Sequence, residues 1–212
     1  MRLFLSSYRA GNYPEKLVKL FGKGTKVAVI TNAKDYKSPA ERQESAGDLL
    51  DFLSELGLKP IELDLRSYFD NKDKLNKELS NYAAVWLAGG NAFLLRRALA
   101  YSGADKLLYD LVRKNELVYA GESAGAILAT PSLTGASGEG EDDPKLVPDG
   151  YQPEIIWNGL DFISYHLVPH YQSEWSGADD MLKTLMAKNL PYKTLTDNQV
   201  LLINGAQEEL LG

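Results

Sequence analysis

Short apolar runs alternate along the chain with longer segments in which apolar residues recur every three or four positions. The short runs are rich in Val, Ile, Leu and Ala, which is typical of strands buried on both faces of a parallel sheet. They predict strands over residues 1–6, 26–31, 60–65, 83–87, 117–120, 162–168, 193–196 and 200–204. The longer segments predict helices over residues 39–56, 91–99, 105–114, 124–129 and 176–188. This alternation predicts an α/β fold, a three-layer sandwich with a mostly parallel sheet.

The clearest helix boundaries lie near residue 38 and at Gly57. Ser38 suits the N-cap position, Pro39 the first helical position and Glu41 the third, which together form a capping box. Gly57 follows the last periodic residue, where helices commonly end. Residues 131–153, in contrast, show no periodicity and are rich in Gly, Pro and Asp. A connection of this length is either functional or mobile.

The composition adds limits on class and partners. A chain of 212 residues can bury one sizeable core, and we expect a single domain over residues 1–212. The net charge of −6 argues against nucleic acid or an anionic membrane as a partner. Neither a membrane span nor a signal peptide is predicted, and the absence of cysteine excludes disulfides and thiolate metal sites. We expect a cytoplasmic protein, with its state as monomer or homodimer left open.

One motif contains a candidate nucleophile. Ser123 lies between Gly121 and Gly125, after an apolar strand and before a helix-compatible segment. This strand–turn–helix setting is typical of a nucleophile elbow, in which the two glycines leave room for a sharp turn. The alternative is a tight turn that carries an incidental serine.

A serine nucleophile needs a general base, and the chain has two histidines, His166 and His170. His166 lies inside a predicted strand and is expected to be structural. His170 follows Pro169, which ends that strand, so it should lie at the carboxyl edge of the sheet, where sites form. His170 is therefore the favoured base. Nothing near the two histidines completes the ligand spacing of a metal site.

The histidine in turn needs an acid. Asp197 lies in a predicted turn between two late strands, where a carboxylate reaches neighbouring strand ends. An ordinary hairpin turn is the competing interpretation of this aspartate. Glu122, Asp142 and Asp143 are further candidates for the acid.

An acyl-transfer site also needs hydrogen-bond donors for the oxyanion. Gly90 follows a predicted strand, and its backbone N–H is proposed to act together with that of Ala124, the residue after the serine. Asn91 is a candidate for substrate binding and also suits the N-cap of the next helix.

Four segments, taken in this order, resemble the peptidase E (aspartyl dipeptidase) family, to which cyanophycinase is more distantly related. They are AGGNAFLLRRAL (88–99), GESAGAIL (121–128), VPHYQ (168–172) and TLTDNQ (194–199). The resemblance implies a glutaminase-like, flavodoxin-type fold and a serine nucleophile in a triad ordered serine, histidine, acid. Carried over, the triad is Ser123, His170 and Asp197, with Gly90 and Ala124 as the oxyanion hole. It implies no metal and no organic cofactor.

The chain departs from this family at two places. Family members commonly have glutamate where this chain has Asp197. Members that prefer an N-terminal aspartate have basic residues soon after the histidine, whereas residues 171–180 contain no Lys or Arg. Strict specificity for Asp-X peptides is therefore not expected. Asp142 and Asp143 are candidates to bind a substrate ammonium instead, or they belong to a solvated acidic loop.

These observations favour a serine peptidase that hydrolyses short peptides through an acyl-enzyme. One alternative is an α/β-hydrolase-like esterase, whose acid would precede its histidine and would be Asp142, Asp143 or Asp161. A second alternative is a non-catalytic small-molecule-binding protein on the same fold.

Overall fold

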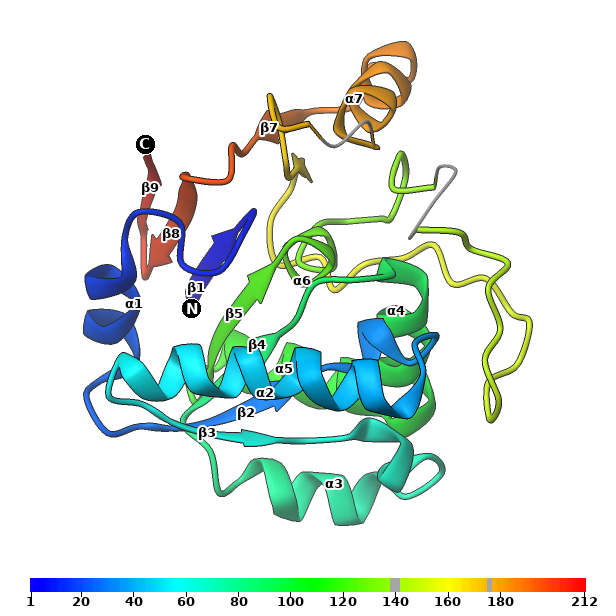
Figure 1. Cartoon of the computed structure of the whole chain (residues 1–212). Coiled ribbons are helices and arrows are strands. Elements are labelled where there is room, and N and C mark those ends of the chain that lie inside the picture. Colours follow the sequence, from blue (N-terminus) through cyan, green and yellow to red (C-terminus); the bar gives the residue numbers. More distant parts are fainter. Residues whose placement is uncertain (138–141, 175–176) are drawn as a thin grey trace.

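The computed structural model describes residues 1–137, 142–174 and 177–212. A seven-stranded sheet in the order β3-β2-β4-β5-β1-β8-β9 forms its centre (Figure 1). Its strands are β1 (Arg2–Ser6), β2 (Lys26–Ile30), β3 (Lys59–Glu62), β4 (Ala84–Leu87), β5 (Val118–Glu122), β8 (Val200–Asn204) and β9 (Gln207–Leu211). The first five strands of this order are mutually parallel, whereas β8 runs antiparallel to β1 and β9 antiparallel to β8.

Helices cover both faces of this sheet. On one face α1 (Pro14–Phe21) and α2 (Pro39–Glu55) pack against strand residues such as Phe4 and Trp86. The other face carries α3 (Lys72–Leu79), α4 (Ala92–Ser102), α5 (Ala104–Arg113) and α6 (Ala124–Ile127). In Figure 1, α2 crosses the front of the sheet and α5 lies behind it. The predicted three-layer α/β sandwich with a mostly parallel sheet is confirmed.

A small second sheet lies beside the central one. It pairs β6 (His166–Val168) with β7 (Tyr192–Thr194) in parallel, and α7 (Gly177–Ala187) connects the two strands. Figure 1 shows β7 and α7 above the central sheet, at its edge near the carboxyl ends of the parallel strands. The two strands predicted over residues 162–168 and 193–196 are therefore shorter than expected and stand outside the main sheet.

The predicted start of α2 is correct in detail. The Ser38 hydroxyl accepts a hydrogen bond from the Glu41 amide at 3.4 Å, and the Glu41 carboxylate accepts one from the Ser38 amide at 3.0 Å. Hydrogen bonds from the Ser38 side chain and backbone lower the pKa of the Glu41 carboxyl. After the helix, Gly57 takes a left-handed φ of 78°, as expected of a residue that ends a helix.

The sequence pattern missed several elements. α1 and α3 are helices of only eight residues each, about two turns, so an apolar period hardly repeats within them. β9 is an edge strand in which four of the five residues are exposed, so it lacks the apolar run of a buried strand. The strand predicted over residues 60–65 ends at Glu62 and is followed by a 3₁₀ turn, Leu65–Tyr68.

The long connection after α6 is tied to the sandwich by a buried arginine. Arg97 is fully buried in α4 and donates hydrogen bonds to the carbonyls of Gln152, Pro144 and Leu146 at 3.1, 3.4 and 2.6 Å. The Tyr151 hydroxyl donates a short hydrogen bond to Asp35 just after β2. The described part of this connection is therefore an ordered layer over α4.

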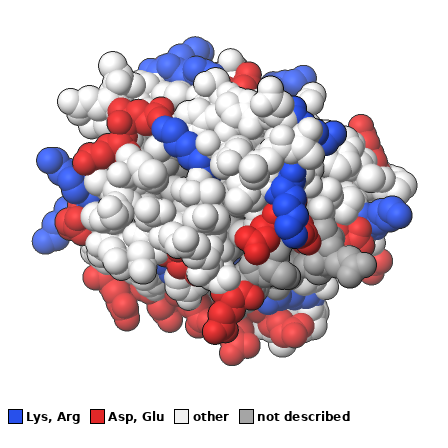
Figure 2. Space-filling view, turned by 90° about the horizontal axis from the view of Figure 1, so that it is seen from above, with Lys and Arg blue, Asp and Glu red and all other residues white. Residues whose placement is uncertain are grey.

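Charge is distributed without one dominant sign on the face seen from above. Figure 2 shows Lys and Arg side chains dispersed over it and Asp and Glu side chains gathered along its lower border. Among the residues that the structure describes, none of the helices combines the length and the apolar character that a membrane span requires.

Replacing Arg97 by methionine tests the role of this arginine. We expect Arg97→Met to lower the free energy of unfolding by about 3 kcal/mol, because it leaves buried carbonyls without a donor. Urea denaturation measures this change. Lys106→Met, which removes the same charge from the exposed surface of α5, should change stability by less than about 0.5 kcal/mol. Equal effects of the two substitutions would contradict the role assigned to Arg97.

Candidate active site

The site is assembled where neighbouring strands of the sheet end. β4, β5 and β1 lie side by side and parallel, so their carboxyl ends meet at one edge. Gly89 and Gly90 follow β4, Ser123 follows β5 and Ser7 follows β1. Because β8 is antiparallel to β1, its beginning lies at the same edge, which brings Asp197 there from the end of the chain. Ligands of open α/β sheets bind at such an edge.

Ser123 occupies a strained turn. Its φ of 48° and ψ of −111° are unusual for a residue with a side chain. A Cβ at Gly121 would lie 2.4 Å from the backbone carbon of Gly125, and a Cβ at Gly125 would lie 2.2 Å from the Leu87 carbonyl oxygen. Both positions therefore require glycine, as predicted for a nucleophile elbow.

The Tyr119 hydroxyl supports this turn from below by donating a 2.6 Å hydrogen bond to the Gly125 carbonyl. Burial raises the pKa of Tyr119, so the hydroxyl remains protonated and keeps this hydrogen bond. The Ser123 amide donates to the Ser6 carbonyl at 3.0 Å, which fixes the turn to β1 as well.

His170 lies between Ser123 and Asp197. Its Nε2 is 3.0 Å from the Ser123 Oγ, and its Nδ1 is 2.7 Å from an Asp197 carboxylate oxygen. His166 lies elsewhere: it is buried in β6, with Nε2 3.0 Å from the Ser132 hydroxyl and Nδ1 3.3 Å from the Pro191 carbonyl. The structure thus brings together the three residues predicted to act as nucleophile, base and acid.

Ser7 is a polar residue of this site that the sequence interpretation missed. Its hydroxyl is fully buried and donates to the Asp197 carboxylate at 2.7 Å, while it accepts a hydrogen bond from the His170 amide at 2.6 Å. One side chain therefore orients the carboxylate and fixes the backbone of His170, whose φ is 58°. Ser7 directly follows the first predicted strand, and this position could have identified it as a residue at the carboxyl edge of the sheet.

The predicted oxyanion donors are the backbone amides of Gly90, which follows β4, and of Ala124, the residue after Ser123. Gly90 has a φ of 132°, and a Cβ there would lie 2.7 Å from the Ala33 carbonyl oxygen, so this turn also requires glycine. The next amide, that of Asn91, donates to this Ala33 oxygen at 2.8 Å. Within the described residues, neither the Gly90 amide nor the Ala124 amide donates to a protein acceptor. Both N–H groups are available for an oxyanion.

The three residues predicted to bind substrate have other contacts. Asn91 is fully buried and caps α4 by accepting from the Leu94 amide at 2.8 Å. The Asp142 carboxylate accepts from the Ala92 amide at 2.8 Å, and the Asp143 carbonyl accepts from the Asn91 side chain at 3.0 Å. These residues join the long connection to the first turn of α4. They do not belong to the described residues that line the cleft beside Ser123.

The cleft beside Ser123 has a volume of about 610 Å³. Its walls hold three acidic side chains, Glu122, Glu174 and Asp197, and three basic ones. The basic residues are Arg9, Lys34 and Lys37. They come from the first 40 residues and not from residues 171–180, the segment after the histidine where the resemblance to peptidase E led us to expect them. The two lysines lie in the connection that follows the second predicted strand, and this placement could have identified them.

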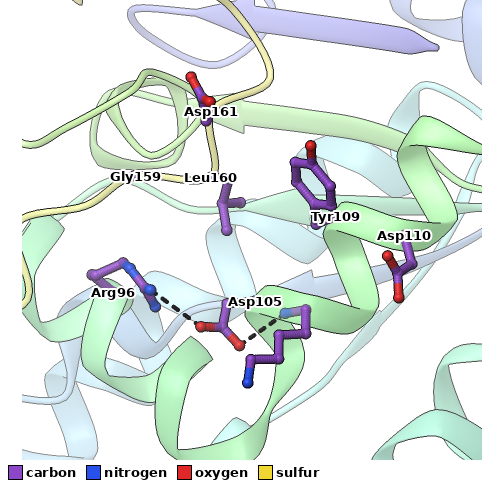
Figure 3. A pocket seen from close by; sticks show the side chains of 8 residues that line it. Arg96, Asp105, Tyr109, Asp110, Gly159, Leu160 and Asp161 are labelled. Carbon is purple, nitrogen blue, oxygen red and sulfur yellow. Dashed lines mark hydrogen bonds and ion pairs between the residues drawn. The ribbon is translucent and has the colours of Figure 1, made fainter.

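A second pocket of about 410 Å³ lies between α4, α5 and residues 159–161 (Figure 3). Arg96 forms an ion pair with Asp105 on its wall at 3.1 Å, and the Asp161 carboxylate stands above it. The described residues that line it include neither serine nor histidine. Asp161, one of the acids considered for an esterase, therefore lies at this pocket and not beside His170. In the described part of the chain, no group of three or more acidic or histidine side chains is arranged to bind a metal ion.

The fold and the site define a class: an α/β sandwich with a serine on a strand–turn–helix at the carboxyl edge of its parallel sheet. The sequence model of peptidase family S51 matches residues 7–211. The chain belongs to this family, which confirms the predicted relationship to peptidase E.

Individual relatives are distant. An uncharacterized peptidase of Listeria innocua is 28% identical over 148 residues, which are 70% of this chain and 59% of that protein. A probable alpha-aspartyl dipeptidase of Drosophila melanogaster is 25% identical over 163 residues, which are 73% of this chain and 63% of that protein. Each of these matches spans less than two thirds of the relative's own length.

The fold is also that of a solved structure, a putative peptidase E protein from Listeria monocytogenes EGD-e. The TM-score is 0.77 at 21% sequence identity, and the match covers 99% of this chain and 97% of that chain.

Removing the Ser7 hydroxyl tests its action on the acid and base. We expect Ser7→Ala to slow the reaction of Ser123 with a fluorophosphonate about tenfold, because the Asp197 carboxylate loses a hydrogen bond that orients it. Intact-protein mass spectrometry follows the labelling. In an Asp197→Asn background the same substitution should have a much smaller effect. Additive effects of the two substitutions would show that Ser7 acts independently of Asp197.

Proposed function

We propose that this protein is a serine peptidase that hydrolyses short peptides and acts as a dipeptidase. The observation that carries the proposal is the continuous contact from Ser123 through His170 to Asp197, at 3.0 and 2.7 Å, beside a cleft of about 610 Å³. Clefts of about 300–1,000 Å³ are typical of small-molecule sites, so this one suits a short peptide. Membership of peptidase family S51 supports the same assignment.

The reaction follows from these contacts. Ser123 Oγ attacks the scissile carbonyl carbon while His170 Nε2 takes its proton, and Asp197 stabilises the imidazolium through Nδ1. The amides of Gly90 and Ala124 stabilise the tetrahedral oxyanion. The imidazolium then gives its proton to the leaving amine, which departs and leaves an acyl-enzyme. Water, deprotonated by His170, hydrolyses the ester and restores Ser123.

The cleft also supports a preference for an acidic first residue. Lys34 and Lys37 stand on its wall, each partly buried, and a substrate carboxylate between them would form charge-assisted hydrogen bonds. The Drosophila relative is named a probable alpha-aspartyl dipeptidase. Residues 171–180, whose lack of basic residues argued against Asp-X specificity, are thus not needed to supply the positive charge.

The first experiment is hydrolysis of a panel of dipeptides, Asp-Ala, Glu-Ala, Gly-Ala and Ala-Ala, by the wild type and by Ser123→Ala. We expect turnover that falls by at least about a thousandfold in the variant, because the nucleophile is lost. Asp197→Asn should cripple turnover as well, whereas it would spare an esterase that uses an acid before its histidine. Absence of turnover for every peptide, together with no fluorophosphonate labelling of Ser123, would favour a non-catalytic protein.

The double substitution Lys34→Gln with Lys37→Gln tests the acidic preference. We expect the ratio of kcat/KM for Asp-Ala to that for Ala-Ala to fall about tenfold or more, because two cations beside the substrate carboxylate are lost. Lys23→Gln, which changes an exposed lysine outside the cleft, should leave the ratio unchanged. A ratio that does not respond to the double substitution would place the determinant elsewhere.

A further inference from the structure

Glu122 is a buried acidic group on the cleft wall for which the proposed mechanism has no role. It ends β5, directly precedes Ser123 and is 7% exposed. Its side chain lines the same cleft as Ser123 and His170. His170 Nδ1 faces Asp197, so Glu122 is not the acid that orients the base.

The hydrogen bonding of this carboxylate is incomplete. One oxygen accepts a 2.7 Å hydrogen bond from the Arg9 amide. No Lys, Arg or His of the described chain forms an ion pair with Glu122. The Arg9 guanidinium turns away, donating to the Asp48 carbonyl at 3.1 Å and lying 5.1 Å from the centre of the Phe52 ring.

A carboxylate has two oxygens that together accept about four hydrogen bonds, and a buried one is normally paired with a cation. The Arg9 amide supplies a single donor without a charge. Glu122 therefore retains the capacity to bind a cationic group that enters from the cleft.

The position of Glu122 relative to Ser123 identifies that group. Gly89 packs against both residues: a Cβ at Gly89 would lie 3.2 Å from the Ser123 Cβ and 3.8 Å from the Glu122 Cγ. In an N-terminal residue, the ammonium nitrogen is two bonds away from the carbonyl carbon. When Ser123 attacks the first peptide bond, the free ammonium must therefore lie within a few ångströms of the nucleophile, in the region that Glu122 borders.

We propose that Glu122 binds the α-ammonium of the first residue of the peptide substrate. This inference rests on the proposed function and deepens it, because it makes a free N-terminus a requirement for efficient reaction. Asp142 and Asp143, which the sequence offered as candidates to bind this group or as part of a solvated loop, contact the first turn of α4 instead. Together with Lys34 and Lys37, Glu122 gives the cleft separate partners for the ammonium and for the acidic side chain of an N-terminal aspartate.

The test uses two probes that react with Ser123 and need no peptide turnover. The first is the diphenyl ester of 1-aminoethylphosphonate, an analogue of N-terminal alanine with a free amine. The second is its N-acetyl derivative, which has no ammonium. In both, a bond forms between Ser123 Oγ and phosphorus and a phenol leaves, so the gain in mass of the intact protein measures the rate of labelling.

We expect the wild type to react faster with the free-amine probe. Glu122→Gln preserves the shape of the side chain and an acceptor for the Arg9 amide but removes the charge. It should slow the free-amine probe by about tenfold to a hundredfold and leave the N-acetyl probe almost unaffected. Glu122→Asp, which keeps the charge, should retain part of the preference. Glu44→Gln, the same change at an exposed site on α2 outside the cleft lining, should retain all of it.

The possible outcomes separate the two proposals. A full amine preference in both Glu122 variants overturns the ammonium assignment and leaves the serine peptidase intact. Equal slowing of the two probes shows a structural role for Glu122 and also overturns it, as does a wild type that reacts equally with both. If neither probe labels Ser123 in the wild type, the proposed function fails, and the ammonium assignment fails with it.

Thermal unfolding midpoints verify that each variant is folded. If Glu122→Gln does not fold, the preference of Glu122→Asp relative to the wild type decides.

Discussion

Close contact between backbone segments at the ends of β4 and β5 is the constraint on which the rest of the site depends. The turn at Ser123 fits against Leu87 because Gly125 carries no side chain, and it closes on itself because Gly121 carries none. The conformation of Ser123 costs on the order of 1–3 kcal/mol, which the surrounding structure must offset. Hydrogen bonds to β1, to α6 and from the buried Tyr119 do so, and they hold the hydroxyl at a defined place.

The glycine turn after β4 is held from two sides. The Ala33 carbonyl accepts the Asn91 amide on one side, and the long connection binds Asn91 and Ala92 on the other. Acidic residues of that connection therefore serve the structure, although their charge first indicated a role in substrate binding. The basic groups that border the cleft come from the segments after β1 and β2, whereas the acidic groups come from the end of β5, the segment after β6 and the segment before β8. The residues after a strand therefore have one of two roles in this site. They form a turn that holds backbone amides in position, or they supply a charged side chain that can contact the substrate.

A site residue could be predicted from the sequence where contacts between nearby residues determine its position, and it was missed where contacts between distant segments do. Ser123 and the flanking glycines were predictable because a strand, a turn and a helix within a dozen residues determine their geometry. His170 was identifiable since the chain has only two histidines and Pro169 ends the strand before it. Asp197 was predicted to be the acid in a turn between two late strands, with an ordinary hairpin turn as the competing interpretation. These strands, β7 and β8, belong to different sheets and form no hairpin. Ser7, Lys34 and Lys37 reach the site through pairing of strands distant in sequence, which a local pattern does not report.

The first strand, β1, lies inside the sheet, between β5 and β8. Its pairing with β8 joins residues about 200 positions apart, such as Arg2 and Asn204. Pairing over such a separation forms late, because a long loop must close first. Asp197 comes to Ser7 and His170 through this pairing. On the ribosome, a nascent chain that already contains the serine and the histidine therefore still lacks the acid, and the three residues assemble only after β8 has been synthesised and has paired with β1.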